Sequence, residues 1–270
     1  MPEGDTVWRT AHHLHAAFAG TELTVTDFRV PAYATVDLRG QRVEDVVSRG
    51  KHLLLRTPEY VVHSHLKMEG AWHLYRLPRP RWRRPAHSAR AVLENADWQA
   101  VGFSLGLLEV LPRERELDAI GYLGPDLLGE RFDVTDAVER LGRDPLRPVF
   151  LALLDQRNLA GLGNEYVNEL LFMRRVAPTC PVGEVDDLTG LVALAQRVIG
   201  ANARRVERSF TGSTRNGEER WVYRRAGLPC RRCGTPIAEG DYGDAPTRER
   251  ICFWCPNCQA ERDPHASVIE

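Results

Sequence analysis

The feature that most constrains this chain is a pair of cysteine knuckles towards its C-terminal end. Cys230 and Cys233 form one C-x2-C pair, Cys255 and Cys258 form a second, and 21 residues separate the pairs. This spacing is typical of a closed four-cysteine zinc hairpin, which leaves no open coordination position for catalysis. Five of the six cysteines lie between positions 230 and 258, and in a reducing compartment such clustering favours metal over disulfides. We therefore expect one structural zinc ion.

A second register is possible in the hairpin, because Cys252 also forms a C-x2-C pair with Cys255. Cys255 and Cys258 enclose Pro256 and mirror the first knuckle, so we assign Cys252 no ligand role. Arg250 lies in the strand that leads into the second knuckle and can extend from the hairpin.

Hydrophobic periodicity divides the remaining chain into two regions. Residues 5–18 have helical spacing, and residues 22–110 show short alternating segments broken by Gly, Pro and Arg-rich turns, which indicates an antiparallel β-sandwich or barrel. Helical spacing returns at 148–154, 165–174 and 187–205. A chain of 270 residues with 43% hydrophobic content can fill two cores, so we expect an α+β fold in two domains.

Composition limits where in the cell the protein is expected and which kinds of binding partner suit it. The chain has no apolar run near 18 residues and no charged-then-apolar leader, which predicts no membrane span and, by default, a cytoplasmic location. A net charge of −1 argues against a uniformly basic nucleic-acid binder. Because Lys51 and Lys67 are the only lysines among 36 basic residues, their positions carry more information than the arginines.

The N-terminal residues Pro2 and Glu3 suit nucleophilic chemistry. Removal of Met1 before a compact proline leaves Pro2 with a free secondary amine, and an α-amino group titrates near pH 7.7 to 8.0. A helix that begins just afterwards lowers this pKa further, because its positive dipole end disfavours an ammonium. Such an amine can form an iminium with an aldehyde-level carbon, with Glu3 as proton donor or acceptor. The plain alternative is that Pro2 only permits Met1 removal and that Glu3 is a solvated acid.

Two turns in the β region are further candidates. Lys51 follows Gly50 at the start of an apolar strand, which can direct its ammonium into a cleft, although an ordinary surface lysine has the same pattern. Met68 follows Lys67 at an expected loop tip closed by Gly70, where methionine is either core filler or a flexible wedge. The segment 76–90 carries six arginines and no acid, and we expect a mobile loop able to touch phosphate.

A Gly-rich turn joins two of the expected helices. Gly161 and Gly163 allow a tight turn, and Asn164 is expected at the N-cap of the helix that follows. Backbone N–H groups and the positive dipole end at that point form an anion site suited to a DNA phosphate. A plain helical hairpin remains the alternative.

Taken together, these motifs resemble the formamidopyrimidine-DNA glycosylase and endonuclease VIII family of base-excision enzymes. The resemblance covers essentially the whole chain and follows the family's order. It implies a β-sandwich catalytic domain, a helix-two-turn-helix bundle and a zinc hairpin. The predicted boundaries are 1–115 for the catalytic domain, 116–135 for a linker, 136–225 for the helix-two-turn-helix domain, 226–262 for the zinc finger and 263–270 for a tail.

The resemblance also implies a function and a set of roles. It implies a bifunctional DNA glycosylase and AP lyase in which Pro2 attacks C1′ of a damaged nucleoside and Glu3 handles protons at the sugar. Lys51 and Arg250 would contact phosphates and assist β,δ-elimination. The DNA-binding set is Lys67, Met68, Asn164, Gly161 and Gly163, with Met68 filling the space that the flipped base vacates. The implied partner is damaged DNA, bound by a monomer.

Two departures from the guanine-oxidation members place the chain on the endonuclease VIII side. Gly4 matches that branch, and only six residues lie between positions 214 and 221, too few for a long lesion-capping loop. Thr6 replaces a glutamate found in many members of both branches, which puts any proton role there in doubt. We therefore expect oxidised pyrimidines as substrates. The alternatives are oxidised purines with the same chemistry, or a zinc-hairpin nucleic-acid-binding protein without catalysis.

Overall fold

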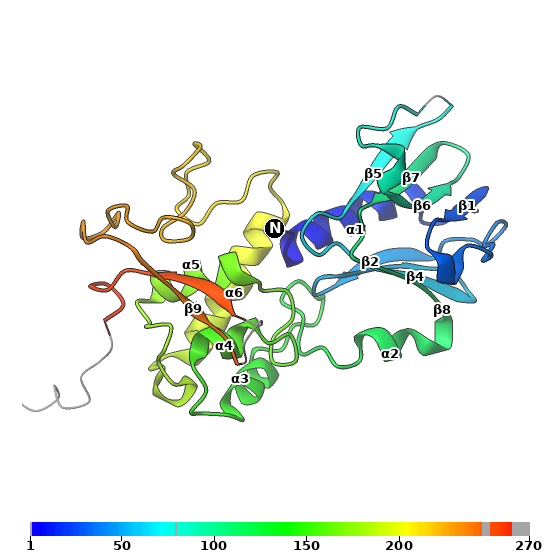
Figure 1. Cartoon of the computed structure of the whole chain (residues 1–270). Helices are drawn as coiled ribbons and strands as arrows, with labels where there is room; N and C mark the ends of the chain where they lie inside the picture. The colour runs from blue at the N-terminus through cyan, green and yellow to red at the C-terminus, as the bar shows by residue number, and fades with distance from the viewer. Residues whose placement is uncertain (1, 79, 245–248, 261–270) are drawn as a thin grey trace, which may run out of the picture. The chain divides into compact units, whose positions relative to one another are not determined.

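The computed structural model describes residues 2–78, 80–244 and 249–260, and the chain folds as two compact units that divide between Tyr122 and Leu123 (Figure 1). Met1 and the predicted tail at 263–270 lie outside the described residues. The division falls inside the predicted linker, 116–135. The first part of that stretch is the short helix α2, Glu116–Ile120, which belongs to the N-terminal unit.

The N-terminal unit begins with helix α1, Gly4–Phe18, whose apolar residues fall on one buried face. Eight strands follow in two four-stranded sheets, and every strand pairing within the sheets is antiparallel. The first sheet has the order β1-β6-β7-β5 and the second β2-β3-β4-β8. The bounds are β1 Val25–Phe28, β2 Asp45–Arg49, β3 His52–Arg56, β4 Tyr60–His65, β5 Ala71–Arg76, β6 Ala89–Glu94, β7 Trp98–Phe103 and β8 Leu107–Pro112.

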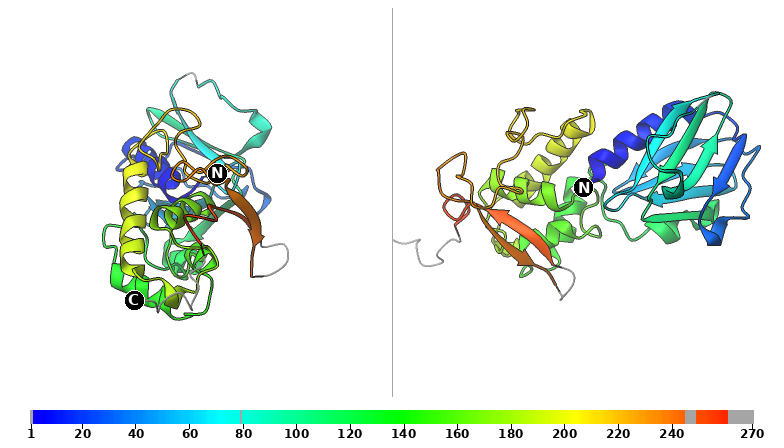
Figure 2. Two further views of the ribbon diagram at one scale, coloured as in Figure 1. Left: turned by 90° about the vertical axis from the view of Figure 1, so that its left-hand side faces the viewer. Right: turned by 45° about the horizontal axis from the view of Figure 1, so that its top comes forward.

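The two sheets and α1 share one hydrophobic core. Side chains from α1, from β1, β6 and β7 of the first sheet, and from all four strands of the second sheet meet in it. Figure 2 shows α1 beside the strands in its right-hand view. This arrangement is a β-sandwich because inward-facing residues of both sheets pack together in this core. The expectation of an N-terminal helix with an antiparallel β-sandwich is therefore confirmed.

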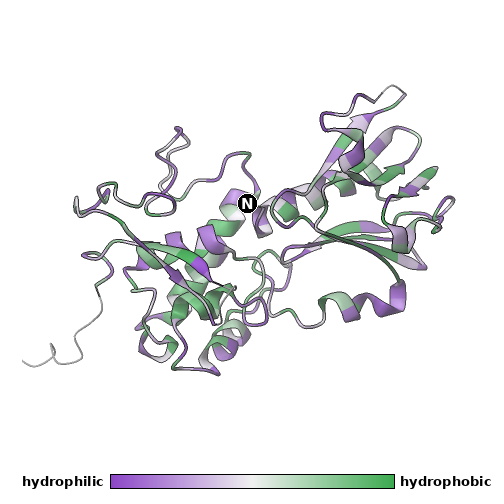
Figure 3. Ribbon diagram, in the orientation of Figure 1, coloured by the Kyte–Doolittle hydropathy of each residue, from purple (hydrophilic) through white to green (hydrophobic). Residues whose placement is uncertain are grey.

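The C-terminal unit is a helical bundle with a two-stranded β-hairpin. Its helices are α3 Val134–Gly142, α4 Val149–Leu154, α5 Asn164–Arg174 and α6 Leu188–Ala203. Residues from all four helices form a second hydrophobic core, and α5 is buried on nearly every side. Figure 3 shows hydrophobic residues along the helices and strands, with mainly hydrophilic loops between them. The expected α+β fold in two domains is confirmed.

The hairpin of the C-terminal unit consists of β9, Ala238–Tyr242, and β10, Arg250–Trp254, paired antiparallel. Cys252 of β10 is fully buried in the helical core. The hairpin is thus part of the same hydrophobic assembly as the bundle. Among the described residues, no helix combines the length and apolar composition that crossing a membrane requires.

The arginine-rich segment 76–90 is anchored where it is described. Trp82 packs against Phe103 with ring centroids 5.5 Å apart, and its indole N–H donates to Gln99. The backbone N–H of Arg83 donates to the Tyr75 hydroxyl at 3.0 Å. The expectation of a mobile loop needs correction here, because an aromatic side chain at its centre packs against strand β7.

Candidate active and DNA-binding site

Pro2 and Glu3 stand directly before helix α1. Glu3 is the N-cap residue, and its carbonyl accepts the backbone N–H groups of Thr6 and Val7 at 3.0 and 3.1 Å. The Glu3 side chain is not an exposed first-turn acid, because the residue is only 1% exposed. A buried carboxylate at the positive end of a helix is electrostatically favoured. Glu3 is therefore held at the helix start beside the half-buried Pro2.

Lys51 lies in the tight turn between β2 and β3. Gly50 has a φ of +57°, a left-handed conformation that glycine adopts without strain. The turn is closed by the pairing of Arg49 with His52. Lys51 itself is half-buried, so it differs from a fully solvated surface lysine.

Helix α1 runs along strand β2 so that the start of the helix and the Lys51 turn lie towards the same end of the N-terminal unit. The Gly20 N–H donates to the Val43 carbonyl, and the Val46 N–H donates to His15 Nδ1, so helix and strand run in opposite directions. From His15 back to Glu3 the helix covers about 18 Å at ~1.5 Å per residue. From Val46 to its end at Arg49 the strand covers about 10 Å at ~3.3 Å per residue, and the turn with Lys51 follows directly. Both paths therefore lead to the same edge of the unit.

Lys67 and Met68 occupy the turn after β4. Lys67 has a φ of +54°, and its stem packs so closely on Gly106 that a Cβ there would meet it at 2.1 Å. Met68 is 63% exposed, so it is not packed as a core side chain. Of the two sequence interpretations, core filler is therefore wrong for Met68. Arg84 braces the turn by donating to the Glu69 carbonyl at 2.7 Å.

The turn between α4 and α5 is held by side chains of its own. Gln156 accepts the Gly161 N–H at 3.0 Å and donates to the carbonyl oxygens of Leu154 and Leu162, both at 2.9 Å. Gly161 has a φ of +115°, which strains any other residue. Both Gly161 and Gly163 are buried. The glycines thus serve a tight, braced connection before α5.

Asn164 does not cap α5. The N-cap residue is Gly163, and Asn164 is the first residue of the helix. Its side-chain amide instead donates to the Ile251 carbonyl in β10 at 2.8 Å, and the Asn168 side chain accepts the Phe253 N–H. Two asparagines one helical turn apart therefore fasten α5 to β10. This arrangement brings Asn164 next to the strand that carries the exposed Arg250.

The four cysteines chosen by spacing lie together. One ligand atom from each of Cys230, Cys233, Cys255 and Cys258 falls within 4.8 Å of all the others. Cys252 is not a member of this group, and burial raises the pKa of its thiol to about 12. A buried protonated thiol is a small hydrophobic side chain in chemical terms. The cluster can hold one metal ion.

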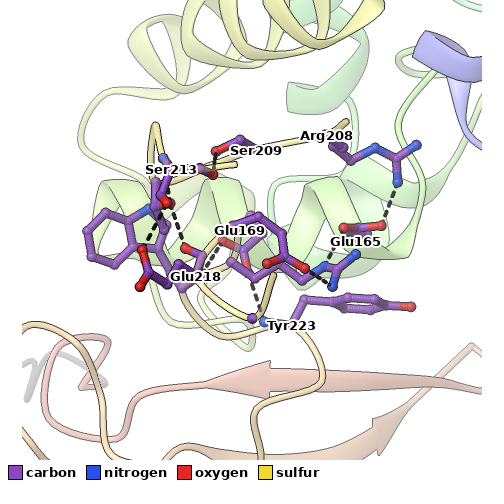
Figure 4. Close-up of polar contacts among 12 residues, drawn as sticks. Glu165, Glu169, Arg208, Ser209, Ser213, Glu218 and Tyr223 are labelled. Atoms are coloured by element: carbon purple, nitrogen blue, oxygen red, sulfur yellow. Dashed lines mark hydrogen bonds and ion pairs between the residues drawn. The ribbon is translucent and has the colours of Figure 1, made fainter. Parts of the chain in front are cut away.

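Sequence reasoning missed two glutamates on α5. Glu169 is fully buried and accepts the backbone N–H groups of Trp221, Val222 and Tyr223 at 2.8 to 2.9 Å (Figure 4). Glu165 forms ion pairs with Arg208 and Arg220. The available signal was two acids four residues apart in the helix that follows the Gly-rich turn. Each organises the chain after α6, which contributes no regular secondary structure between 204 and 237.

Burial and hydrogen bonding act on Glu169 in opposite directions. Burial disfavours the charged form and raises the pKa to about 7, while the three N–H donors pull it down. Glu165 lies one turn closer to the helix start, where its charge is balanced by two arginines. The acids therefore fasten the segment 208–223 onto α5.

Comparison with known proteins places these features in one family. The family model described as "Formamidopyrimidine-DNA glycosylase N-terminal domain" matches residues 1–104, and the "Formamidopyrimidine-DNA glycosylase H2TH domain" matches residues 123–207. A protein of Mycolicibacterium smegmatis named DNA-(apurinic or apyrimidinic site) lyase Nei2 is 51% identical over 96% of this chain and 99% of its own. A probable endonuclease 8 2 of Streptomyces coelicolor is 50% identical over 98% and 96%.

Solved structures agree at the level of the fold. A Lactococcus lactis Fpg structure, in complex with DNA that contains an abasic site, superposes with a TM-score of 0.78 at 23% identity and covers 96% of this chain and all of its own. The family models, the relatives matched over nearly their whole length and the fold therefore all indicate the same family. The chain belongs to the formamidopyrimidine-DNA glycosylase and endonuclease 8 family.

Proposed function

We propose that this chain is a bifunctional DNA glycosylase and AP lyase that removes oxidised bases, pyrimidines in particular, through a Schiff base on Pro2. Membership of the family and the names of its full-length relatives support the glycosylase and lyase activities. The observation that carries the chemical proposal is the placement of Pro2 directly before α1, beside the buried carboxylate of Glu3.

In the proposed reaction the Pro2 amine attacks C1′ of the damaged nucleoside. The bond from C1′ to the base breaks, the base leaves and the sugar ring opens to give an iminium. Glu3 transfers protons at the sugar, which its position at the helix start favours. Lys51 and Arg250 hold phosphates while β-elimination and then δ-elimination cleave the strand. Lys51 suits this role because its turn and the start of α1 reach the same edge of the N-terminal unit.

The remaining proposed contacts fix the DNA. Lys67 contacts a phosphate and the exposed Met68 fills the space left by the flipped base, since a flexible thioether adapts to an irregular gap. The braced turn with Gly161 and Gly163 presents the start of α5 to a phosphate. Asn164 contributes by fixing the strand that carries Arg250, in addition to its place in the first turn of α5.

We assign zinc to the cysteine cluster. A tetrahedral zinc ion with Zn–S bonds of about 2.3 Å requires sulfur atoms roughly 3.8 Å apart. The Sγ atoms of Cys230 and Cys258 are 3.9 Å apart, and those of Cys233 lie 3.5 Å from Cys255 and 3.5 Å from Cys258. These distances fit zinc with all four positions taken by sulfur. Bound there, the ion fixes the hairpin that carries Arg250 and supplies no catalytic group.

The preference for pyrimidines rests on the short loop after α6. The Phe210 N–H donates to the Glu219 carbonyl at 2.8 Å, and the Ser213 hydroxyl donates to the Glu218 carboxylate at 2.9 Å (Figure 4). The loop is thus closed on itself and too short to cover a large base. A Lactococcus lactis structure with DNA containing N7-benzyl-Fapy-dG and one with an oxidised pyrimidine both share the fold, so oxidised purines stay the alternative.

Borohydride trapping tests the proposal. Duplex DNA with one thymine glycol, or with one 8-oxoguanine opposite cytosine, is incubated with the protein and sodium borohydride, which reduces an iminium to a stable amine. We expect a covalent complex that forms faster with thymine glycol. A non-catalytic zinc-hairpin binder would give none.

Retention of Met1 provides the matched control, because it converts the Pro2 nitrogen into an amide without changing any other residue. A preparation shown by mass spectrometry to retain Met1 should not be trapped. Undiminished trapping by that preparation would remove Pro2 from the reaction.

A further inference from the structure

Three histidines and a glutamate gather on one face of the second sheet, next to the Lys51 turn. His52 pairs directly with His65 across β3 and β4, and His63 pairs directly with Glu109 across β4 and β8. Directly paired residues and residues two apart point to the same face of a sheet. The neighbouring positions Leu53 and Val62 belong to the sandwich core. The polar cluster is therefore on the outer face.

Hydrogen bonds link these groups into one chain. Glu109 Oε2 lies 2.9 Å from His63 Nδ1, and His63 Nε2 lies 2.7 Å from His52 Nδ1. His52 Nε2 lies 3.1 Å from the hydroxyl of Tyr122, the last residue of the N-terminal unit. The side chain of His63 is only 2% exposed, whereas Glu109 is 33% exposed. This series of hydrogen bonds thus crosses the sheet through the buried side chain of His63.

The donors and acceptors that each side chain offers give this series of hydrogen bonds one direction. An ionised carboxylate only accepts, so His63 must donate from Nδ1 to Glu109. A neutral His63 then accepts at Nε2, so His52 donates from Nδ1. Its own Nε2 then accepts the Tyr122 hydroxyl. With His63 neutral, both imidazoles therefore carry their proton on Nδ1.

Burial and nearby positive charge favour the neutral forms of His52 and His65. Burial, with His63, His65, Lys67 and Lys51 nearby, lowers the pKa of His52 to about 3. Burial together with Lys67, Lys51 and His63 lowers the pKa of His65 to about 4. The His65 Nδ1 atom also accepts the Lys67 N–H at 2.9 Å. Neutral imidazoles add no further positive charge beside Lys51 and Lys67.

We propose that Glu109, His63 and His52 form a one-way hydrogen-bond relay that positions Lys51 for strand cleavage. His52 is the residue after Lys51 and begins β3. The relay fixes the imidazole of His52, and through its backbone the turn that presents Lys51. Tyr122 closes the far end. The part that concerns Lys51 rests on the proposed function, whereas the direction of the relay does not.

The relay is tested by the tautomers of its histidines. Long-range proton–nitrogen NMR on the full-length, zinc-loaded protein at pH 7 distinguishes Nδ1–H from Nε2–H imidazoles, with signals assigned by single His→Gln variants. We expect His52 and His63 both to be neutral Nδ1–H. An Nε2–H form of His52 in the unsubstituted protein would overturn the proposal.

Substitution of Glu109 gives the signature of a relay. Glu109→Gln keeps an acceptor and should preserve both tautomers, whereas Glu109→Met removes it and should turn both His63 and His52 to Nε2–H. His52 does not touch Glu109, so a merely structural role of the carboxylate would not change its tautomer. An unchanged His52 in Glu109→Met, with His63 altered, would refute the relay even though both proteins fold.

Cleavage of a preformed AP site tests the consequence for Lys51. We expect single-turnover cleavage by Glu109→Met to slow about tenfold at saturating protein, with DNA affinity within about twofold, because misplacement of a group costs rate more than binding. Asp45→Leu is the matched control: Asp45 is also 33% exposed and on the same sheet, but it pairs with Arg56. If Glu109→Met changed both histidine tautomers but left the cleavage rate unchanged, the proposed role of the relay in positioning Lys51 would be refuted. If the unsubstituted protein failed to cleave AP DNA, the proposed function would fail while the tautomers would still decide the relay.

Discussion

Replacement of Glu169 by glutamine should change how the stability of the protein depends on pH. The folded-state pKa of Glu169 is about 7 against an ordinary value of 4.5, and its carboxylate is fully buried. A difference of roughly 2.5 corresponds to about 3 kcal/mol, at ~1.36 kcal/mol per pKa unit. The raised pKa means that the folded state holds the proton more tightly than the unfolded state. This contribution to stability is therefore complete below pH 4.5 and is lost as the pH rises through 7.

Glutamine resembles the protonated acid but does not titrate. Below pH 4.5 we expect the difference in unfolding free energy between Glu169→Gln and the unsubstituted protein to be constant with pH. Between pH 4.5 and pH 8 the variant should gain about 3 kcal/mol relative to the unsubstituted protein. The side-chain NH2 group of glutamine cannot accept the Trp221 N–H, which costs about 1–3 kcal/mol at any pH. This cost shifts the plot of unfolding free energy against pH without changing its slope.

Urea unfolding followed by tryptophan fluorescence measures both proteins from pH 4 to pH 8.5. Because both carry the same cysteine cluster, the pH dependence of metal binding cancels in the difference. A difference that is flat with pH, or that grows in favour of the unsubstituted protein, would refute the reasoning. It would mean that the three N–H groups outweigh burial and hold the carboxylate ionised.

Three other predictions concern the hairpin and DNA binding. Cys258→Ser should lose both zinc, measured by atomic absorption, and DNA affinity, whereas Cys252→Ser should keep one zinc per chain; zinc loss in the Cys252 variant would show that the register was misassigned. Arg250→Ala should reduce the log–log salt slope of DNA affinity by about 0.9, the value for one phosphate contact on duplex DNA, and an unchanged slope with lost cleavage would make Arg250 a catalytic group without a phosphate. Asn164→Ala should weaken DNA binding in fluorescence anisotropy with little change in slope, since it removes an uncharged fastening of β10; a slope reduced by a full unit would contradict this.

The sequence alone determined the features that local spacing encodes. The two cysteine knuckles specify a metal cluster because a C-x2-C turn presents both sulfur atoms to one point. The apolar period of 5–18 predicted α1, and the alternating segments predicted a β-sandwich. Pro2 needs no fold to become an N-terminal amine. For the same reason the resemblance to the family was visible before the structure, since its motifs are short and occur in order.

Tertiary structure decided what the polar side chains do. Asn164 has the sequence signature of an N-cap, yet its partner is Ile251, 87 residues away. Glu169 looked like a routine helical acid until the fold placed three backbone N–H groups around it. Met68 was compatible with a core or a loop tip, and the structure places it exposed in the turn after β4.

The relay shows why such partners escape sequence analysis. His63 meets Glu109 because β4 and β8 pair in one register, and a slip by one residue would turn one of them to the opposite face. Register depends on the hydrophobic cores that both sheets share, so it is a property of the whole unit. A local pattern records which side chains can donate or accept. Only the folded chain determines which of them meet.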